Sequence, residues 1–303
     1  MNSFFKNIEF QFADDKNEKY HNNKDYISAS GLKKIKQSPL HFIEEEKKET
    51  EAMTFGSAYH TLILEPEKFD KKYYVFDETE ILQILISEGS QKPRGTNKYK
   101  EWYQIEMDKA AGKELIELPA FHLLESMKKR LFSHRYVKSL LTNGEAEKSI
   151  YTTIGLEVGG SVNVKIRPDY LKQNKRIIVD LKTTSDASVN GFPRNAAEYD
   201  YHIQSALYTD IMELIEGKSM PWEFFFIAQE KTRPFAFNIF LASPQFQSQG
   251  RYEYEKLLTL YKYCKENNRW PGYQCYTESK YGVNILNLPP YSIKEIQWFD
   301  HKI

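Results

Sequence analysis

Short apolar runs that end at polar turns dominate residues 149–182, a pattern typical of β-strands. Two of these runs, 161–166 and 176–179, are separated by the polar segment 171–175. They predict a β-hairpin whose polar and charged residues gather at one end.

Segments with helical spacing lie on both sides of this β region, and they are bounded by capping residues, glycine and proline. The predicted helices begin with a serine-capped start at 28–35 and continue at 53–64, 120–141, 195–215 and 243–267. A second strand pair is predicted at 223–229 and 235–241, and residues 88–112 predict a loop followed by a helix. Helices flanking a central mixed sheet indicate one α/β domain. We expect it to span 26–273, between a polar N-terminal extension, 1–25, and a C-terminal tail, 274–303.

Two carboxylates and a lysine stand at the ends of the paired apolar runs. Asp169 follows the first run, and Asp180 and Lys182 end the second. Residues two apart on a strand share a face, so Asp180 and Lys182 point the same way, and Asp169 reaches that place from the neighbouring strand. Converging carboxylates repel each other unless a cation lies between them, and Mg²⁺ is the obvious candidate. An Asp-x-Lys pair also occurs as a solvated strand end or an ion pair, so this spacing alone does not distinguish these from a metal site.

Composition narrows the class of protein. The 303 residues are 41% hydrophobic and 28% charged, which is ordinary for a soluble globular chain. A net charge of zero argues against a simple basic DNA-coating protein, although a basic channel can coexist with an acidic exterior. The two cysteines, Cys264 and Cys275, are too few for a disulfide framework or a four-cysteine iron–sulfur cluster. With neither a membrane-length apolar run nor a signal-peptide core, we expect a cytoplasmic protein without membrane contact.

Two further pairs have helical spacing, Gly56 with His60 and Gln204 with Tyr208, so each pair shares one helix face. Taken alone, each pair is compatible with ordinary packing of an apolar or amphipathic helix. In chain order, however, Gly56-x-x-x-His60, Arg167-Pro168-Asp169, Asp180-Leu181-Lys182 and Gln204-x-x-x-Tyr208 resemble the PD-(D/E)xK nuclease superfamily. Within it, the chain most resembles the RecE (exonuclease VIII) C-terminal nuclease domain, which is related to RecB-type and lambda-type exonucleases.

The resemblance implies a restriction-endonuclease-like core and a role for each motif residue. His60, Asp169, Asp180 and the carbonyl of Leu181 would hold Mg²⁺, for which Mn²⁺ can substitute. Lys182 would orient the attacking water or stabilise charge on the phosphate. Gln204 and Tyr208 would lie beside the site, contacting DNA or holding Lys182. The superfamily often has glutamate where this chain has Asp180, but aspartate is common in the RecE and RecB groups.

Other residues are candidates for contact with DNA. Ser30 resembles a serine near the 5′-phosphate pocket of lambda-type exonucleases, and Thr183 follows Lys182. Lys165 and Arg167 share one strand face, which either meets the DNA backbone or is simply solvated. Lys33 and Lys34 would either support that pocket or form a solvated helix face, and the solvated face is the expectation. Glu147 is either an accessory acid or a surface residue.

The expected function is hydrolysis of linear double-stranded DNA by a metal-dependent exodeoxyribonuclease, running 5′ to 3′. It would leave 3′ single-stranded tails for a RecT-like annealing protein in phage-type recombination, and a homo-oligomeric ring would thread the duplex. One alternative is a single-strand or flap nuclease of the RecB-like group, as in its CRISPR-associated relatives. Those usually carry a cysteine-ligated iron–sulfur cluster, and the presence of only Cys264 and Cys275 argues against that branch. Another is a non-catalytic DNA-end-binding module, against which the intact set of His60, Asp169, Asp180 and Lys182 argues.

Overall fold

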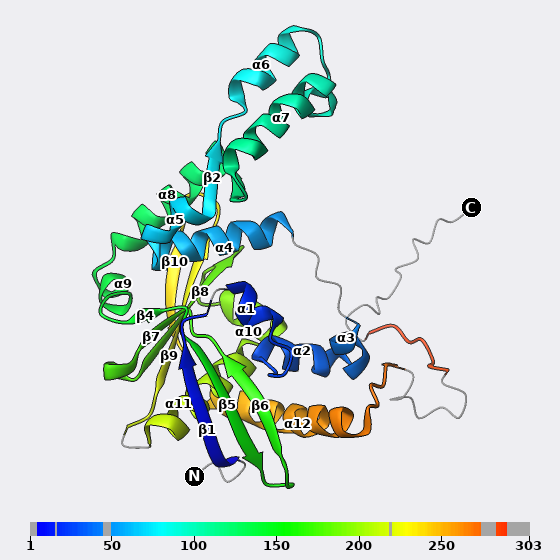
Figure 1. Cartoon of the computed structure of the whole chain (residues 1–303). Coiled ribbons are helices and arrows are strands. Elements are labelled where there is room, and N and C mark those ends of the chain that lie inside the picture. The colour runs from blue at the N-terminus through cyan, green and yellow to red at the C-terminus, as the bar shows by residue number, and fades with distance from the viewer. Residues whose placement is uncertain (1–4, 16, 45–49, 218–219, 274–282, 290–303) are drawn as a thin grey trace, which may run out of the picture.

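Two β-sheets that meet at the chain segment 167–169 organise the molecule. The computed structural model describes residues 5–15, 17–44, 50–217, 220–273 and 283–289 (Figure 1). The central sheet has the order β10-β9-β8-β7-β4. Its strands are β4 (Glu145–Ala146), β7 (Tyr170–Lys172), β8 (Ile177–Thr184), β9 (Glu223–Glu230) and β10 (Phe237–Leu241). Only β8 and β9 are parallel among these pairs, so the sheet is mixed.

The second sheet is antiparallel and has the order β1-β5-β6, with β1 (Phe5–Ala13), β5 (Ser149–Leu156) and β6 (Ser161–Ile166). β1 pairs with β5 along its length. Residues 5–13 therefore belong to the sheet, and the division into an extension, 1–25, a domain, 26–273, and a tail stays a prediction. The predicted C-terminal tail lies outside the described residues except for 283–289, which carry no helix or strand.

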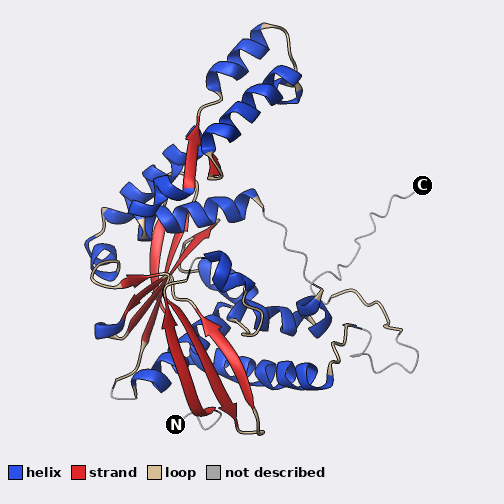
Figure 2. Ribbon diagram, in the orientation of Figure 1, coloured by secondary structure: helices blue, strands red, loops and turns tan. Residues whose placement is uncertain are grey.

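Helices cover both faces of the central sheet (Figure 2). Alternate residues of β8 and β9 belong to two different apolar clusters, one on each face. Ile178 and Phe224 pack with α2 (Ala29–Gln37), α11 (Tyr201–Glu216) and α12 (Pro244–Asn267). Val179 and Phe225 pack with α4 (Glu51–Leu64), α8 (Leu118–Phe132) and α9 (Arg135–Leu140). A strand covered on both faces needs apolar residues at nearly every position, which explains the continuous run Phe224–Ala228 in β9.

The remaining elements are short or project from the body. The short helices are α1 (Asn17–Asn22), α3 (Pro39–Ile43), α5 (Pro66–Lys72), α10 (Phe192–Glu198) and the 3₁₀ turn η2 (Gln173–Lys175). A helical arm extends away from the sheets (Figure 1). It contains β2 (Tyr73–Phe76), α6 (Thr79–Ser87), the 3₁₀ turn η1 (Pro93–Gly95), α7 (Asn97–Ala110) and β3 (Glu114–Glu117). The parallel pair β2–β3 forms the base of this arm.

The predicted α/β class with a restriction-endonuclease-like core is confirmed, and three details differ. β8 forms its hairpin with β7, which the sequence placed in the turn, while β6 pairs with β5. The helix predicted over 120–141 is two helices, α8 and α9. The one predicted over 195–215 is α10 and α11, divided where Asp200 adopts φ 52°, a left-handed conformation that interrupts a helix. Among the described residues, no helix has both the length and the apolar character needed to cross a bilayer.

Candidate active site

Asp180 and Lys182 lie on the same face of β8, toward α11, as residues two apart on a strand must. Lys182 Nζ is 2.5 Å from Asp180 Oδ2. The other oxygen, Asp180 Oδ1, accepts a 2.6 Å hydrogen bond from Gln204 Nε2 on α11. Gln204 is therefore the partner of Asp180, whereas the family resemblance implied a contact with Lys182 or DNA.

Asp169 occupies the junction between β6 and β7. The preceding residue, Pro168, has no N–H to donate, so the strand ladder is interrupted there and the chain passes from one sheet to the other. Asp169 Oδ2 accepts a 2.7 Å hydrogen bond from the backbone N–H of Leu181. This bond ties the carboxylate of one strand to the middle of the Asp180-Leu181-Lys182 motif.

His60 reaches the same motif from α4. Its Nε2 lies 3.0 Å from the carbonyl oxygen of Leu181. Because a carbonyl oxygen only accepts, Nε2 is the nitrogen that carries a proton in this contact. The other ring nitrogen, Nδ1, lies 3.5 Å from Asp169 Oδ2 and 3.9 Å from Glu147 Oε1. His60, Asp169 and the carbonyl of Leu181 are thus brought to one place, and Asp180 stands next to Leu181 on β8.

Glu147 is the member of this cluster that the sequence left undecided. Ligand atoms of His60, Glu147 and Asp169 all lie within 4.8 Å of one another. Glu147 has φ 51°, and its N–H donates to the carbonyl of Asp169 over 3.0 Å. A non-glycine residue in the left-handed region is strained, and such strain concentrates at functional sites. No spacing in the sequence distinguishes Glu147 from Glu145, because the approach of Glu147 to His60 depends on the bend of the chain between β4 and β5.

Burial dominates the electrostatics of the two aspartates. It raises the pKa of both Asp169 and Asp180, against the lowering effect of neighbouring His60 and Lys182. Burial alone would lower the pKa of Lys182, but Asp180 and Asp169 outweigh it and raise that pKa. Likewise, burial opposes protonation of His60, but Asp169 and Glu147 raise its pKa to about 9. Lys182 is therefore a fixed positive charge and is unsuited to act as a general base.

The donor set fits a hard divalent cation. His60, Glu147 and Asp169 supply an imidazole and two carboxylates within 4.8 Å of one another, with the carbonyl of Leu181 and the carboxylate of Asp180 next along the chain. Oxygen-rich sets of this kind suit Mg²⁺ or Mn²⁺. Asp180 Oδ2 is buried and accepts no hydrogen bond of good geometry, despite its short ion-pair distance to Lys182. The Lys182 ammonium is the partner of this oxygen, and together they place a carboxylate and a positive charge beside Leu181.

Three residues predicted to contact DNA or flank the site have structural partners instead. Lys165 is buried, and its Nζ donates to the carbonyls of Tyr20 and Asn23 over 2.5 and 2.6 Å, which does not fit a contact with the DNA backbone. Arg167 Nε donates to the carbonyl of Glu147 over 3.0 Å and lies 2.9 Å from its Oε2, so it positions Glu147. Tyr208 is buried, and its hydroxyl lies 3.5 Å from the carbonyl of Arg167.

The remaining candidates stay accessible. Ser30 is exposed in the first turn of α2, and Thr183 is half-buried beside Lys182.

Lys33 was expected on a solvated face, but its Nζ lies 4.9 Å from the centre of the Tyr201 ring. Lys182 Nζ lies 4.8 Å from the same ring centre. Burial, with a further contribution from Lys182, lowers the pKa of Lys33 to about 8. Lys33 thus joins the site as a second amine.

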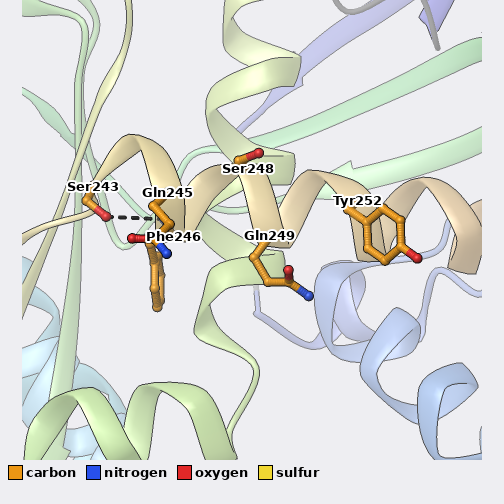
Figure 3. Close-up of a pocket in the computed structure, with 6 residues that line it drawn as sticks. All are labelled: Ser243, Gln245, Phe246, Ser248, Gln249 and Tyr252. Atoms are coloured by element: carbon orange, nitrogen blue, oxygen red, sulfur yellow. Dashed lines mark hydrogen bonds between the residues drawn. The ribbon is translucent and has the colours of Figure 1, made fainter.

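A groove of about 690 Å³ lies along α12 (Figure 3). It is lined by Ser243, Gln245, Phe246, Ser248, Gln249 and Tyr252. None of these side chains is acidic or basic, so the groove offers neither carboxylates for a cation nor positive charge for a phosphate. The chemistry of the fold lies instead at the cluster around Leu181.

Comparison with known proteins agrees with this geometry. A family model described as a PDDEXK-like domain of unknown function, DUF3799, matches residues 28–279. The chain belongs to this family. The predicted membership of the PD-(D/E)xK nuclease superfamily is thereby confirmed, whereas the closer likeness to RecE stays a prediction. No curated protein matches the chain significantly.

A solved structure shares the fold of this PDDEXK-like chain. It is the crystal structure of a protein from Eubacterium rectale that is described as a putative exonuclease. The TM-score is 0.58 at 17% sequence identity, and the match covers 91% of this chain and 96% of the other. At this identity the likeness establishes the shared fold alone.

Proposed function

We propose that this PDDEXK-like protein is a metal-dependent exodeoxyribonuclease that hydrolyses phosphodiester bonds of linear double-stranded DNA. The observation that carries the proposal is the convergence of His60, Glu147 and Asp169 on the strand that bears Asp180 and Lys182. Carboxylates and a lysine held together in this way suit the hydrolysis of a phosphate ester. The same group would be a costly concentration of buried charge in a protein that only packs.

Each side chain has a role that follows from its surroundings. Asp169, Asp180, Glu147, His60 and the carbonyl of Leu181 would hold Mg²⁺, or Mn²⁺ in its place. When bound, such a cation supplies the charge that polarises a scissile phosphate and lowers the pKa of water. Lys182 keeps its positive charge and stabilises the negative charge that develops on the phosphate. Cleavage on this scheme leaves a 5′-phosphorylated nucleotide.

Polarity, partners and assembly are the finer part of the proposal. Degradation from 5′ to 3′ would leave a 3′ single strand for a RecT-like annealing protein. The putative exonuclease that shares the fold supports action at DNA ends. A ring with a basic lumen would reconcile the zero net charge with DNA binding, because a basic lumen can coexist with an acidic exterior. Gel filtration that gives only monomer would remove the ring.

The decisive experiment is digestion of linear duplex DNA with a 5′-phosphate on one end only. Reactions contain Mg²⁺, Mn²⁺ or EDTA, with the wild type, Asp180→Asn or the matched control Asp70→Asn, an exposed aspartate on α5. We expect metal-dependent loss from the phosphorylated end by the wild type and the control, and none by Asp180→Asn. Failure of the wild type to cut linear duplex with either metal would overturn the proposal. Single-stranded and flap substrates would then be the ones to test.

A further inference from the structure

A second groove, of about 520 Å³, opens where β8 ends and α10 passes into α11. Its lining includes Thr183 from β8, Asn195, Glu198 and Tyr199 from the α10 region, and Lys231 from the turn after β9. Its volume lies in the range of small-molecule sites, which bind groups the size of a nucleotide. None of the residues in this lining is needed to hold the catalytic carboxylates.

An aromatic column forms one wall of the groove. Tyr199 is 55% exposed and stacks on Tyr201, with ring centres 5.9 Å apart and an interplanar angle of 27°. Tyr201 stacks in turn on Phe226 of the central sheet, at 5.7 Å and 23°. The left-handed turn at Asp200 brings these two tyrosines together at the end of α10. Tyr199 is therefore the outer ring of a column whose base is fixed in the core.

The column also connects the groove to the catalytic lysine. Tyr201 lines the groove, and its ring lies under Lys182 Nζ at 4.8 Å. Thr183, the residue after Lys182, lines the groove as well. A nucleotide with its phosphate at Lys182 would thus have its base within reach of Tyr199.

The polar lining suits a base edge without selecting one base. Glu198 accepts hydrogen bonds and Lys231 donates them, and both are exposed at the rim. Stacking on an aromatic ring tolerates all four bases, because each base has a π-face. These features suit an enzyme that must move through any sequence.

We propose that this groove is a nucleobase subsite, in which the unpaired base of the nucleotide next to the scissile phosphate stacks on Tyr199. The inference rests on the proposed nuclease function, because it requires a nucleic-acid strand at Lys182. It adds that the terminal base pair is opened before cleavage and that the cleaved strand enters the groove.

The test uses duplex DNA with 2-aminopurine at or next to the 5′ terminus, since the fluorescence of this base falls when it stacks on an aromatic ring. Binding is measured in Ca²⁺, and a gel verifies that the DNA remains intact. Tyr199→Ala removes the ring, Tyr199→Phe keeps it, and Tyr263→Ala removes a tyrosine of similar exposure, 52%, from α12. Thermal melting verifies that each variant is folded.

We expect DNA bound to the wild type, Tyr199→Phe and Tyr263→Ala to be equally quenched, and DNA bound to Tyr199→Ala to fluoresce more strongly, because the unpaired base then has no ring to stack on. In digestion, Tyr199→Ala should raise KM about tenfold, with kcat nearly unchanged, which is the scale of one lost base stack. A folded Tyr199→Ala that quenches and digests like the wild type would overturn the subsite while leaving the nuclease proposal intact. Quenching that depends on Tyr199 in a protein without cleavage would support the subsite and defeat the nuclease proposal.

Discussion

Gln204 donates its side-chain amide to Asp180 across the gap between α11 and β8, over 2.6 Å. Asp180 is 1% exposed, so this amide, together with Lys182, decides how the carboxylate points. Groups that orient a metal ligand in this way affect affinity for the cation without touching it.

Gln204→Leu should therefore weaken binding of Mg²⁺ or Mn²⁺ by about 10- to 100-fold, because Asp180 loses the donor that fixes its orientation. Activity should recover in part when the metal concentration is raised. Calorimetric titration with Mn²⁺ and the dependence of rate on Mg²⁺ measure both effects. Gln83→Leu, an exposed glutamine on α6, is the matched control. If Gln204→Leu instead raised KM for DNA at an unchanged metal requirement, the residue would contact DNA, as the sequence resemblance allowed.

Local motifs in the sequence predicted most of the elements that build the site. The pairs Asp180 with Lys182 and Gln204 with Tyr208 follow from strand and helix periods, which are properties of neighbouring residues. Glu147 was not assigned, because its place depends on a left-handed backbone turn and on pairing with Asp169, which sequence spacing does not encode. Lys165 was misassigned because a strand period gives the face of a residue but not what covers that face. The break at Asp200 was missed for a similar reason, since no glycine or proline marks it.

Lys33 should make kcat/KM depend on pH, and the substitution Lys33→Arg should abolish this dependence. Burial lowers its pKa to about 8, so its amine is charged below that pH and neutral above it. If the charge helps to hold the DNA phosphate, kcat/KM falls as pH rises through 8, by up to about tenfold per pH unit. Lys33→Arg stays charged and should not show this fall. The measurement is the ratio of kcat/KM for the two proteins between about pH 7 and 9.

The matched control for Lys33 is Lys100→Arg, which changes an exposed lysine on α7. Taking the ratio of the two proteins cancels the effect of pH on the attacking water, which both share. A ratio that stays constant across this range would show that the charge of Lys33 does not contribute to DNA binding.

Glu147→Gln tests whether the cluster acts as a unit. The substitution keeps the shape of the side chain but removes one of the two carboxylates that face His60 Nδ1. Fewer negative ligands lower the attraction for a divalent cation, so the Mg²⁺ concentration for half-maximal activity should rise roughly tenfold. Glu145→Gln changes a more exposed glutamate two residues away and should leave that concentration unchanged. If the two variants needed the same Mg²⁺ concentration for half-maximal activity, Glu147 would be a surface acid that does not contribute to metal binding.

Two helical glycines provide the last prediction, because they differ in what a methyl group would meet. A Cβ on Gly250 of α12 would lie 1.9 Å from the carbonyl oxygen of His202, whereas a Cβ on Gly56 of α4 has nothing within 4 Å. Gly250→Ala should destabilise the protein by about 1–3 kcal/mol, as overpacking does. Gly56→Ala should stabilise it by roughly 0.5–1 kcal/mol, because alanine favours a helix. Urea denaturation measures both changes.

Activity of the same two variants then separates fold from function. Gly56 lies one helical turn from His60, so a strand of DNA approaching the cluster would pass the place where its side chain is missing. If close approach needs that space, Gly56→Ala loses activity while it gains stability, and Gly250→Ala loses activity only as far as it unfolds. A Gly56→Ala protein that is both more stable and fully active would show that DNA cleavage does not require the space left by this glycine.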